Sequence, residues 1–518
     1  MNNIRESTLK ISLISNIILE PYFGAMISKK FAGYKKIDLK TVDFLNILSE
    51  SFDARNISNA DYVIVCLNFD CLYPNCLNKI IKNNNHNEFF QNSVKMCENL
   101  YNYILQNSRA EIIWFGFEDY CYEVGFIKPI TACINGLIDK INLKLSSMIK
   151  SKYIDFKKII AQVGIDNSYY AKGKYRWNSP YSKDLIQQMV DEIFSIYASI
   201  NGITKKCLIL DCDNVLWGGI LSEDGIHKIQ LSGSSFGRVY QEFQQFVELL
   251  YYHGIIIAIC SKNDLSDVLQ VFKEHNGMIL KKEQIACFMV NWGNKPSNII
   301  KIAETLNIDL NSLVFVDDSD FEIESVKSTL PQVETIKFEK YSNYFYKKFE
   351  CFCPKKEINI TEIDLRNNTY RTNEQRNSLK ETSASFEEYL QALEMSVEIK
   401  KTQLSDVARI SELSQRTNKC TNGKRYTTEQ IVLKMKEDEY SLYTITLSDK
   451  FSDLGIVGVI GIEKSTLDLF SLSCRALGRG IEEKMIEYAY LKGAKNYHFE
   501  DTGKNLDLRN KFSSRWEC

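Results

Sequence analysis

Histidine, net charge and long apolar runs are all scarce in this chain, and each shortage excludes a class of protein. The 518 residues include five histidines, and His86 is the only one in the first 200, so a serine–histidine hydrolase is not expected there. The net charge of −2 and pI near 6.3 give no basic footprint for nucleic acid. No apolar run approaches the ~18 residues of a membrane span, and Glu20 and Pro21 interrupt the apolar stretch 11–18, so we expect a cytoplasmic protein without membrane contact.

Cysteine is not scarce, but its pattern lacks the pairs that would indicate a special use. The 15 cysteines are scattered through apolar stretches, as reduced core residues would be. Cys66, Cys71 and Cys76 are evenly spaced, yet no Cys-x-x-Cys pair and no nearby histidine accompany them. Neither a disulfide framework nor a zinc site is therefore expected.

The chain is long enough for about three domains. In residues 1–200, apolar strands alternate with polar helices, with strands expected at 10–18, 62–67 and 111–115, which indicates a small α/β domain. We expect this domain to resemble an SGNH hydrolase in fold but to be non-catalytic, with a docking or scaffolding role. A second α/β domain is expected over 203–345, a helical linker over 346–395 and an α+β domain over 396–518.

The apolar run at 208–210 ends in two carboxylates one residue apart, Asp211 and Asp213, followed by the loop that contains Gly218 and Gly219. A short apolar run of this kind predicts a buried parallel strand. Open α/β sheets bind ligands beyond the carboxyl ends of their strands. Two carboxylates there suit a hard cation such as Mg²⁺, and one could attack phosphorus while the other handles the proton.

Three further polar groups follow in order, each near an expected strand. The run 254–260 leads into Ser261, Lys295 lies just before a helical stretch, and the run 313–316 ends in Asp317 and Asp318. Asp-x-Asp, Ser, Lys and Asp-Asp in this order resemble the four motifs of the haloacid dehalogenase (HAD) superfamily. Ordinary acidic loop caps are the alternative interpretation.

The last 120 residues have a different pattern. Helices are expected at 405–417 and 428–437, and strands at 441–447, 456–463 and 466–472. The loop Arg475-Ala-Leu-Gly478-Arg479-Gly480 then precedes a helix, and it resembles the pyrophosphate loop of the GNAT acetyltransferase fold. Glycines there would let backbone N–H groups approach a phosphate at a helix N-terminus.

Over nearly its whole length the chain resembles the FkbH-like proteins, a subclass IIIC group of the HAD superfamily. The resemblance rests on these segments: 206–219, 223–225, 258–264 with Ser261, Lys262 and Asn263, 316–322, 415–418 with Asn418, 424–426 and 472–480. It implies a glyceryl transferase that dephosphorylates 1,3-bisphosphoglycerate, a small three-carbon substrate, and loads the glyceryl unit onto the phosphopantetheine of an acyl carrier protein, for polyketide or glycan biosynthesis.

The motifs then suggest a role for each residue. Asp211 would attack or position the phosphoryl group and Asp213 would be the general acid and base. Asp211, Asp213 through its carbonyl, and Asp317 would hold Mg²⁺ with help from Asp318. The other expected contacts are these: Ser261 and Lys295 with the phosphoryl oxygens; Trp217, Gly218, Gly219, Lys262, Asn263 and Asn418 with substrate; Arg475, Gly478, Arg479 and Gly480 with pantetheine. Core packing is an equal alternative for Trp217.

Acyl transfer also raises the question of a protein thioester. We expect Cys474 to be the best candidate because it ends the strand before the GNAT-like loop, with Cys260, Cys207 or a direct transfer as alternatives. For each cysteine the simpler interpretation is a small buried apolar residue. Three other functions remain open: a Mg²⁺-dependent phosphatase of a small metabolite, an N-acetyltransferase fused to a phosphatase, and a non-catalytic carrier-docking protein.

Overall fold

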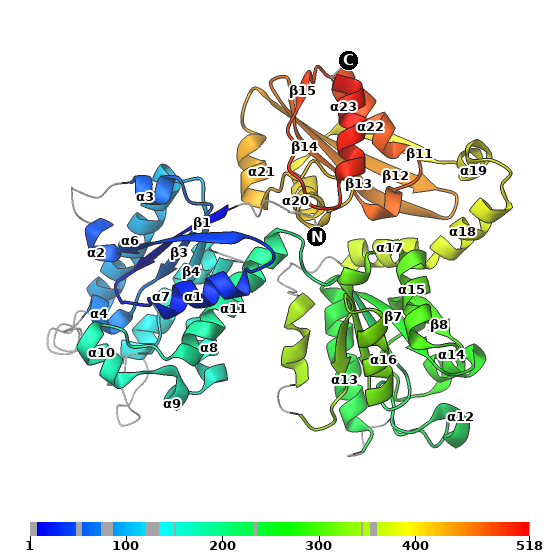
Figure 1. Ribbon diagram of the computed structural model, residues 1–518, viewed down its shortest axis with the longest axis horizontal. Coiled ribbons are helices and arrows are strands. Elements are labelled where there is room, and N and C mark those ends of the chain that lie inside the picture. The colour runs from blue at the N-terminus through cyan, green and yellow to red at the C-terminus, as the bar shows by residue number, and fades with distance from the viewer. Residues whose placement is uncertain are drawn as a thin grey trace. The chain divides into compact units, whose positions relative to one another are not determined.

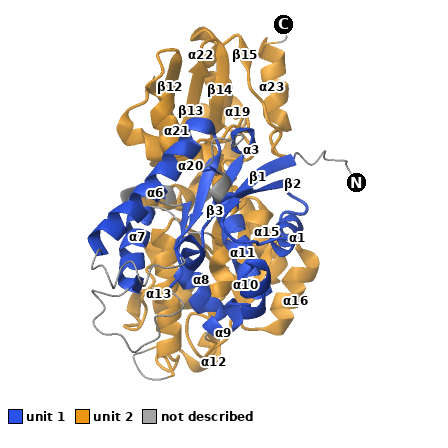
Figure 2. Cartoon of the chain, turned by 90° about the vertical axis from the view of Figure 1, so that its left-hand side faces the viewer, with its two compact units in different colours: residues 1–197 blue, residues 198–518 orange. Residues whose placement is uncertain are grey.

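The computed structural model describes residues 8–47, 54–73, 86–119, 134–149, 152–231, 236–342, 345–352 and 360–516. The chain divides into two compact units, residues 1–197 and 198–518 (Figure 2). The residues described in these units form three five-stranded sheets, of which two are fully parallel (Figure 1). The expected α/β class is confirmed at this level. The expected boundaries near 345 and 396 both fall inside the second unit and stay predictions.

The first unit is a parallel sheet with strand order β2-β1-β3-β4-β5. Its strands are β1 Thr8–Ser15, β2 Lys36–Asp43, β3 Tyr62–Cys66, β4 Glu111–Phe115 and β5 Tyr153–Ile154. Its helices are α1 Tyr22–Lys30, α2 Phe44–Ile47, α3 Arg55–Ser58, α4 Phe69–Leu72, α6 His86–Asn107, α7 Ile134–Ile149, α8 Phe156–Val163, α9 Ile165–Ser168, α10 Ala171–Trp177 and α11 Lys183–Ile200. Of the three strands expected from the sequence, 111–115 coincides with β4, whereas 10–18 and 62–67 overlap β1 and β3 with shifted ends.

The second unit begins with a parallel sheet of order β10-β9-β6-β7-β8. Its strands are β6 Cys207–Leu210, β7 Ile256–Ser261, β8 Ile285–Val290, β9 Leu313–Asp317 and β10 Glu334–Lys337. Its helices are α12 Leu221–Asp224, α13 Arg238–Tyr252, α14 Leu265–Glu274, α15 Lys295–Leu306 and α16 Asp320–Thr329. Strand β6 lies at the centre, so its carboxyl end lies between those of β7 and β9.

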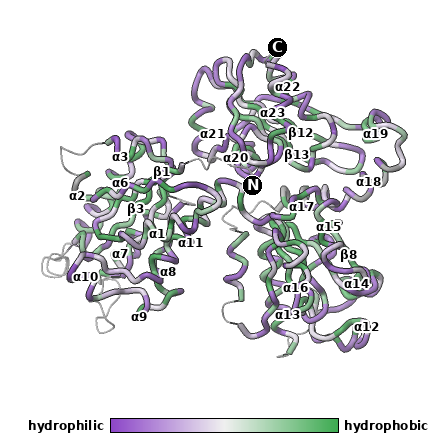
Figure 3. The backbone as a smooth tube through the Cα atoms, in the orientation of Figure 1, coloured by the Kyte–Doolittle hydropathy of each residue, from purple (hydrophilic) through white to green (hydrophobic). Residues whose placement is uncertain are grey.

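Every residue of β6 is buried because both faces of the sheet are covered. Side chains alternate along a strand, so Leu208 and Leu210 enter one apolar core while Cys207 and Ile209 enter the other. Cys260 of β7 also lies in the second core. Figure 3 shows the hydrophobic stretches running along the strands of each sheet.

The remainder of the second unit is helical and then mainly antiparallel. A 3₁₀ segment Phe345–Phe352 and helices α17 Ile360–Arg371, α18 Asn373–Thr382 and α19 Phe386–Ala392 precede the third sheet. That sheet contains β11 Ser396–Lys401, β12 Tyr440–Asp449, β13 Ser452–Glu463, β14 Thr466–Leu472 and the two-residue β15 Asn496–Tyr497, in sequential order. Its helices are α20 Val407–Arg416, α21 Thr428–Lys434, α22 Ile481–Leu491 and α23 Leu506–Trp516.

Among the described residues, no helix combines the length and the apolar character needed to cross a bilayer. Cys66 is buried and Cys71 is half-buried, whereas Cys76 lies outside the described residues.

Candidate active site

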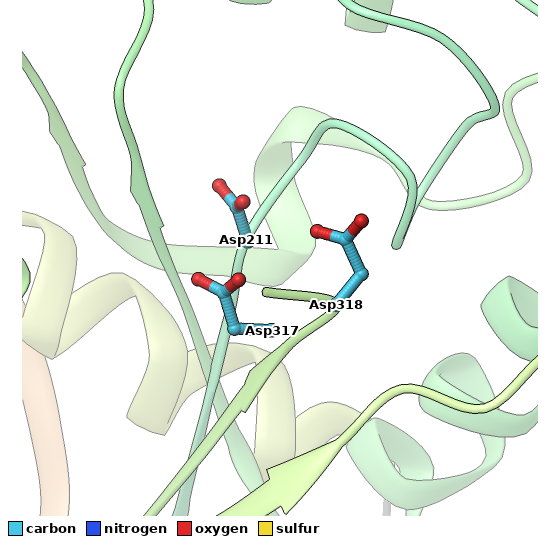
Figure 4. A group of neighbouring side chains, drawn as sticks. All are labelled: Asp211, Asp317 and Asp318. Atoms are coloured by element: carbon cyan, nitrogen blue, oxygen red, sulfur yellow. The ribbon is translucent and has the colours of Figure 1, made fainter. Parts of the chain in front are cut away.

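Three carboxylates meet at the carboxyl edge of the second unit's parallel sheet. Asp211 follows β6, Asp317 ends β9 and Asp318 comes directly after it. One ligand oxygen from each lies within 4.8 Å of the others, and Figure 4 shows the three side chains gathered at the strand tips. The register that pairs β6 with β9 brings them together: Leu210 lies opposite Val316, one residue before each aspartate.

Lys295 is the cation of this group, and its position comes from a well-formed helix start. Asn294 caps α15 by accepting a hydrogen bond from the amide of Ser297, at 2.9 Å, which fixes the first turn. The Lys295 ammonium is 2 % exposed and lies 2.8 Å from Asp211 Oδ1 and 3.2 Å from Asp317 Oδ2. It also donates to the carbonyl of Cys260 at 2.7 Å. The lysine therefore bridges the carboxylates of Asp211, which is 13 % exposed, and Asp317, which is buried.

The pKa values of the group indicate that one lysine does not fully compensate three carboxylates. Burial raises the pKa of Asp317 to about 6; repulsion by Asp211 adds to the rise and Lys295 opposes it. Burial and then Asp211 likewise raise the pKa of Asp318. Burial alone would lower the pKa of Lys295, but Asp211 and Asp317 outweigh it and hold that pKa above its usual value.

The same group fits a hard divalent cation. Among the described residues, Asp211 Oδ1 and Asp317 Oδ2 are buried and accept no well-directed hydrogen bond, so that only the Lys295 ammonium compensates them. Carboxylate oxygens at this spacing are the ligands that Mg²⁺ prefers. Asp211, Asp317 and Asp318 are therefore the side chains that would hold the metal.

The carboxylate of Asp213 is not part of that group, because other residues hold it. Its Oδ1 accepts hydrogen bonds from Trp217 Nε1 at 2.9 Å and from the amide of Leu221 at 3.1 Å. Its Oδ2 accepts one from Asn263 Nδ2 at 3.0 Å. Burial raises the pKa of Asp213, and these hydrogen bonds oppose the rise. Any contact of Asp213 with a metal would come from its main-chain carbonyl, as expected from the motif.

Several residues expected to contact substrate are instead tied to their neighbours. Trp217 is fully buried and orients Asp213. Gly218 pairs its backbone with Gln230, and a Cβ there would come within 2.7 Å of the Tyr240 ring. Gly219 has φ +98°, which favours glycine, and its amide donates to the Asn214 side chain. These three positions shape the loop around the site.

The polar residues after β7 divide between two tasks. Ser261 is 1 % exposed and its hydroxyl accepts a hydrogen bond from Asn263 Nδ2 at 3.1 Å, beside the Asp213 carboxylate. Lys262 turns away and pairs with Glu322 of α16 at 2.6 Å. The structure therefore brings Ser261 and Asn263 into the site with Asp211 and Asp213, whereas Lys262 links the segment after β7 to helix α16.

The candidates from the third sheet lie at the other edge of the parallel sheet. The Cys474 carbonyl accepts a hydrogen bond from Asn307 Nδ2 at 2.7 Å, and the thiol lies near Lys206, the residue before β6. Asn418 donates to the carbonyl of Gly202 and accepts from Arg425. Lys206 and Asp211 are separated by a whole strand, or roughly 16 Å at ~3.3 Å per residue. Cys474 and Asn418 are thus not brought together with Asp211.

The other two cysteines are buried among apolar side chains. Cys207 and Cys260 are both 0 % exposed. Burial raises the pKa of the Cys260 thiol to about 12 and that of Cys207 well above its usual value. A thiol with so high a pKa is a poor nucleophile at neutral pH, so both fit the simpler role of small core residues.

The GNAT-like loop has the expected backbone conformation, but its arginine side chains are buried within the protein. Gly478 and Gly480 have φ +71° and +70°, and Gly480 caps α22. Arg479 donates to Asp449 at 3.1 Å and is 6 % exposed, and Arg475 is equally buried. Glu482 and Glu483 lie in the first turn of α22, where they interact favourably with the helix dipole, and both pair with Lys511. Pantetheine binding at this loop stays a prediction.

The structure contains a second buried polar cluster, which the sequence did not lead us to expect. In the first unit, Glu118 is 3 % exposed, and its Oε1 accepts hydrogen bonds from Asn68 and from the Tyr181 hydroxyl, the latter at 2.7 Å. Burial raises the pKa of Glu118 to about 7. An asparagine and a glutamate a few residues after β3 and β4, at the carboxyl edge of a parallel sheet, are the signal that could have identified it.

Comparison with known proteins finds a similar solved structure but no matching family model. No protein-family model matches the chain, and no curated protein matches it. The N-terminal part of protein BF1531 from Bacteroides fragilis, whose crystal structure contains a phosphatase domain complexed with Mg, has a TM-score of 0.57 at 24% identity and covers 68% of this chain and 95% of its own. A HAD family enzyme from Bacteroides thetaiotaomicron, in complex with magnesium and inorganic phosphate, has a TM-score of 0.21 at 14% identity and covers 28% and 98%. The first likeness shows that the fold is shared with a phosphatase-domain structure.

Proposed function

We propose that the chain is a Mg²⁺-dependent phosphotransfer enzyme of the HAD type in which Asp211 attacks phosphorus. The observation that supports this most strongly is the group of three carboxylates within 4.8 Å at the tips of parallel strands, two of which, Asp211 and Asp317, are bridged by the buried Lys295. Bound magnesium would offset phosphate charge and align the displacement. The likeness to a Mg-containing phosphatase-domain structure adds support.

The chain's own residues divide the chemistry between them. A carboxylate oxygen of Asp211 attacks phosphorus while the bond to the leaving-group oxygen breaks, and Asp213 donates a proton to that oxygen. A water molecule then attacks the aspartyl phosphate and passes its proton to Asp213, which restores the starting state. Lys295 and Ser261 donate to phosphoryl oxygens as charge develops. Asn263 and Trp217 hold the Asp213 carboxylate in place.

The finer part of the proposal is the substrate and the acceptor. We propose that the enzyme removes the phosphate ester of 1,3-bisphosphoglycerate and passes the glyceryl group to the phosphopantetheine thiol of an acyl carrier protein, in the cytoplasm. In that step a thiolate attacks the acyl carbon, and the bond to the acyl-phosphate oxygen breaks as phosphate leaves. Support comes from the motif resemblance over 206–219, 258–264, 316–322 and 472–480. Cys474 is the best protein thiol for an intermediate because it alone of the three candidates is half-exposed.

A phosphatase without acyl transfer is the second candidate function. It is favoured by the roughly 16 Å of strand between Asp211 and the edge where Cys474 lies. It is favoured also by the acidic first turn of α22.

Phosphate release separates the core of the proposal from the alternatives. The full chain would be incubated with Mg²⁺ and 1,3-bisphosphoglycerate generated in situ, and phosphate release from the ester would be followed for Asp211→Asn. Asp320→Asn is the matched control, since Asp320 lies at the same sheet edge but is 79 % exposed and pairs with Lys337. Loss in the first variant alone is expected. Full release by Asp211→Asn would refute the assignment.

Intact-protein mass spectrometry tests the acyl transfer. With a phosphopantetheinylated carrier present, a glyceryl-sized mass increase should appear on the carrier, and on the enzyme if a thioester forms. The enzyme adduct should be absent from Cys474→Ala. Phosphate release with neither adduct would leave the phosphatase as the function.

A further inference from the structure

Exposed aromatic side chains are concentrated in one short segment of the first unit, residues 165–178, which we call the 165–178 surface. Tyr175 is 76 % exposed, Trp177 52 %, Tyr170 45 % and Ile165 70 %. The segment contains α9 and α10 (Figure 1). Trp, Tyr and Arg are the residue types that carry most of the energy at protein interfaces. Isolated exposed apolar residues need no explanation, but such a group within 14 residues does.

The same segment is basic. Lys172, Lys174 and Arg176 stand against a single acidic residue, Asp166. Lys174 pairs with Asp70 of α4 at 2.9 Å. Lys172 and Arg176 are exposed, and neither has an acidic partner among the described residues. Two exposed cations without a described acidic partner thus share the seven-residue helix α10 with Tyr175 and Trp177, on a chain whose net charge is −2.

The segment is fixed to the sheet beneath it. Asn178 has φ +52° and ends α10; its carbonyl accepts from the amide of Ile18 at 2.8 Å, and its side chain donates to the carbonyl of Asn16 at 3.0 Å. Asn16 follows β1 and Asp70 follows β3, so the segment is attached at the carboxyl ends of two neighbouring parallel strands. A surface held in this way loses little conformational entropy on binding, which favours affinity.

We infer that the 165–178 surface docks an acidic protein, the acyl carrier protein that receives the glyceryl group. This inference rests on the proposed function, which requires such a partner. Cations on this surface match the acidic charge of a carrier, and the aromatic side chains supply the apolar contact. A lipid surface is the less suitable partner, because α10 has only seven residues and cannot lie in a membrane as an extended amphipathic helix.

Direct binding is the test. A panel of fluorescently labelled, phosphopantetheinylated acyl carrier proteins would be titrated with the full chain, and the Kd followed by anisotropy at low and at high salt. Two variants divide the surface: Lys172→Glu with Arg176→Glu removes the charge, and Tyr175→Ala with Trp177→Ala removes the rings. Each is expected to weaken binding at least about tenfold, and only the first should abolish the salt dependence.

The control changes an exposed apolar residue and an exposed cation elsewhere on the same unit. Leu143 of α7 is 73 % exposed and precedes Lys144, which is 53 % exposed and lies 3.8 Å from Glu98, so Leu143→Ala with Lys144→Glu removes an apolar side chain and reverses a charge outside the surface. Its Kd should equal that of the unaltered chain. Circular dichroism would confirm that all variants are folded.

Each contrary result overturns the inference. Binding of no carrier in the panel, equal binding by the surface variants, or equal loss in the control would do so. Binding to anionic phosphatidylglycerol vesicles in place of carriers, lost in the same variants, would identify a membrane site instead. Phosphate release that depends on Asp211 is measured without a carrier, so a failed docking surface and a failed proposed function give different results.

Discussion

Trp217 offers the sharpest test of how the site works, because its indole donates a hydrogen bond to the Asp213 carboxylate, the group proposed to transfer the proton. The ring is 0 % exposed and Nε1 donates to Asp213 Oδ1 at 2.9 Å. Trp217→Phe removes this donor and keeps an aromatic ring in the core. Two donors to Asp213 remain, the amide of Leu221 and Asn263 Nδ2.

The expected magnitude follows from the strength of a hydrogen bond to a charged group, about 1.5–3 kcal/mol. At ~1.4 kcal/mol per factor of ten, its loss should lower kcat by about tenfold or more. KM should change little, because Asp213 acts on the proton and not on phosphate binding. Burial raises the pKa of Asp213 and the Trp217 hydrogen bond helps to lower it, so the variant's pKa should rise. The limb of the kcat profile that reports Asp213 should move to higher pH.

Phosphate release by the full chain with saturating Mg²⁺ is the assay, and Trp114→Phe is the matched control. Trp114 of β4 is also 0 % exposed, and its Nε1 has no acceptor among the described residues, so the same substitution removes no hydrogen bond. An unchanged kcat in folded Trp217→Phe, or an equal decrease in Trp114→Phe, would refute the positioning role.

Three further predictions concern stability. Burial and Asp211 raise the pKa of Asp317 to about 6, so its ionised form destabilises the metal-free fold above that pH. Asp317→Asn should therefore raise Tm in EDTA at pH 8 by a few degrees and should abolish the Tm shift with Mg²⁺. A lower Tm would contradict this. Burial raises the pKa of Glu118 from 4.5 to about 7. The first unit's free energy of unfolding, measured by urea titration, should therefore fall by ~3 kcal/mol as the pH rises between those values. Glu118→Gln should show no such fall. Arg376 is 2 % exposed and donates two hydrogen bonds to buried Asp449, at 2.8 and 3.0 Å. Arg376→Met should therefore lower the second unit's free energy of unfolding, measured in urea, by about 3–5 kcal/mol. The same change at an exposed arginine should have no effect.

Much of the fold could be predicted because its signals are local. Strand β4 coincides with the expected 111–115, and the apolar runs before Asp211 and Asp317 form buried parallel strands. In such strands a continuous apolar run is required, since helices cover both faces. The order of the acidic and basic groups along the chain likewise predicted which residues gather at the sheet edge.

The partners of individual side chains could not be predicted in this way. Lys262 was expected at the substrate and pairs with Glu322, 60 residues away. Arg479 was expected at a phosphate and lies in a buried network with Asp449 and Arg376. Both depend on contacts between distant segments, for which a motif contains no information.

The sequence by itself determined the parallel strands, their acidic ends and the chemistry that three carboxylates and a lysine can perform, because strand periodicity and side-chain type are properties of short segments. Only the tertiary structure decided that Trp217 and Asn263 hold Asp213, and that Cys474 lies at the edge opposite to Asp211. The physical reason is that β6 separates the two edges by its own length, and the strand register alone determines which side chains meet at each end.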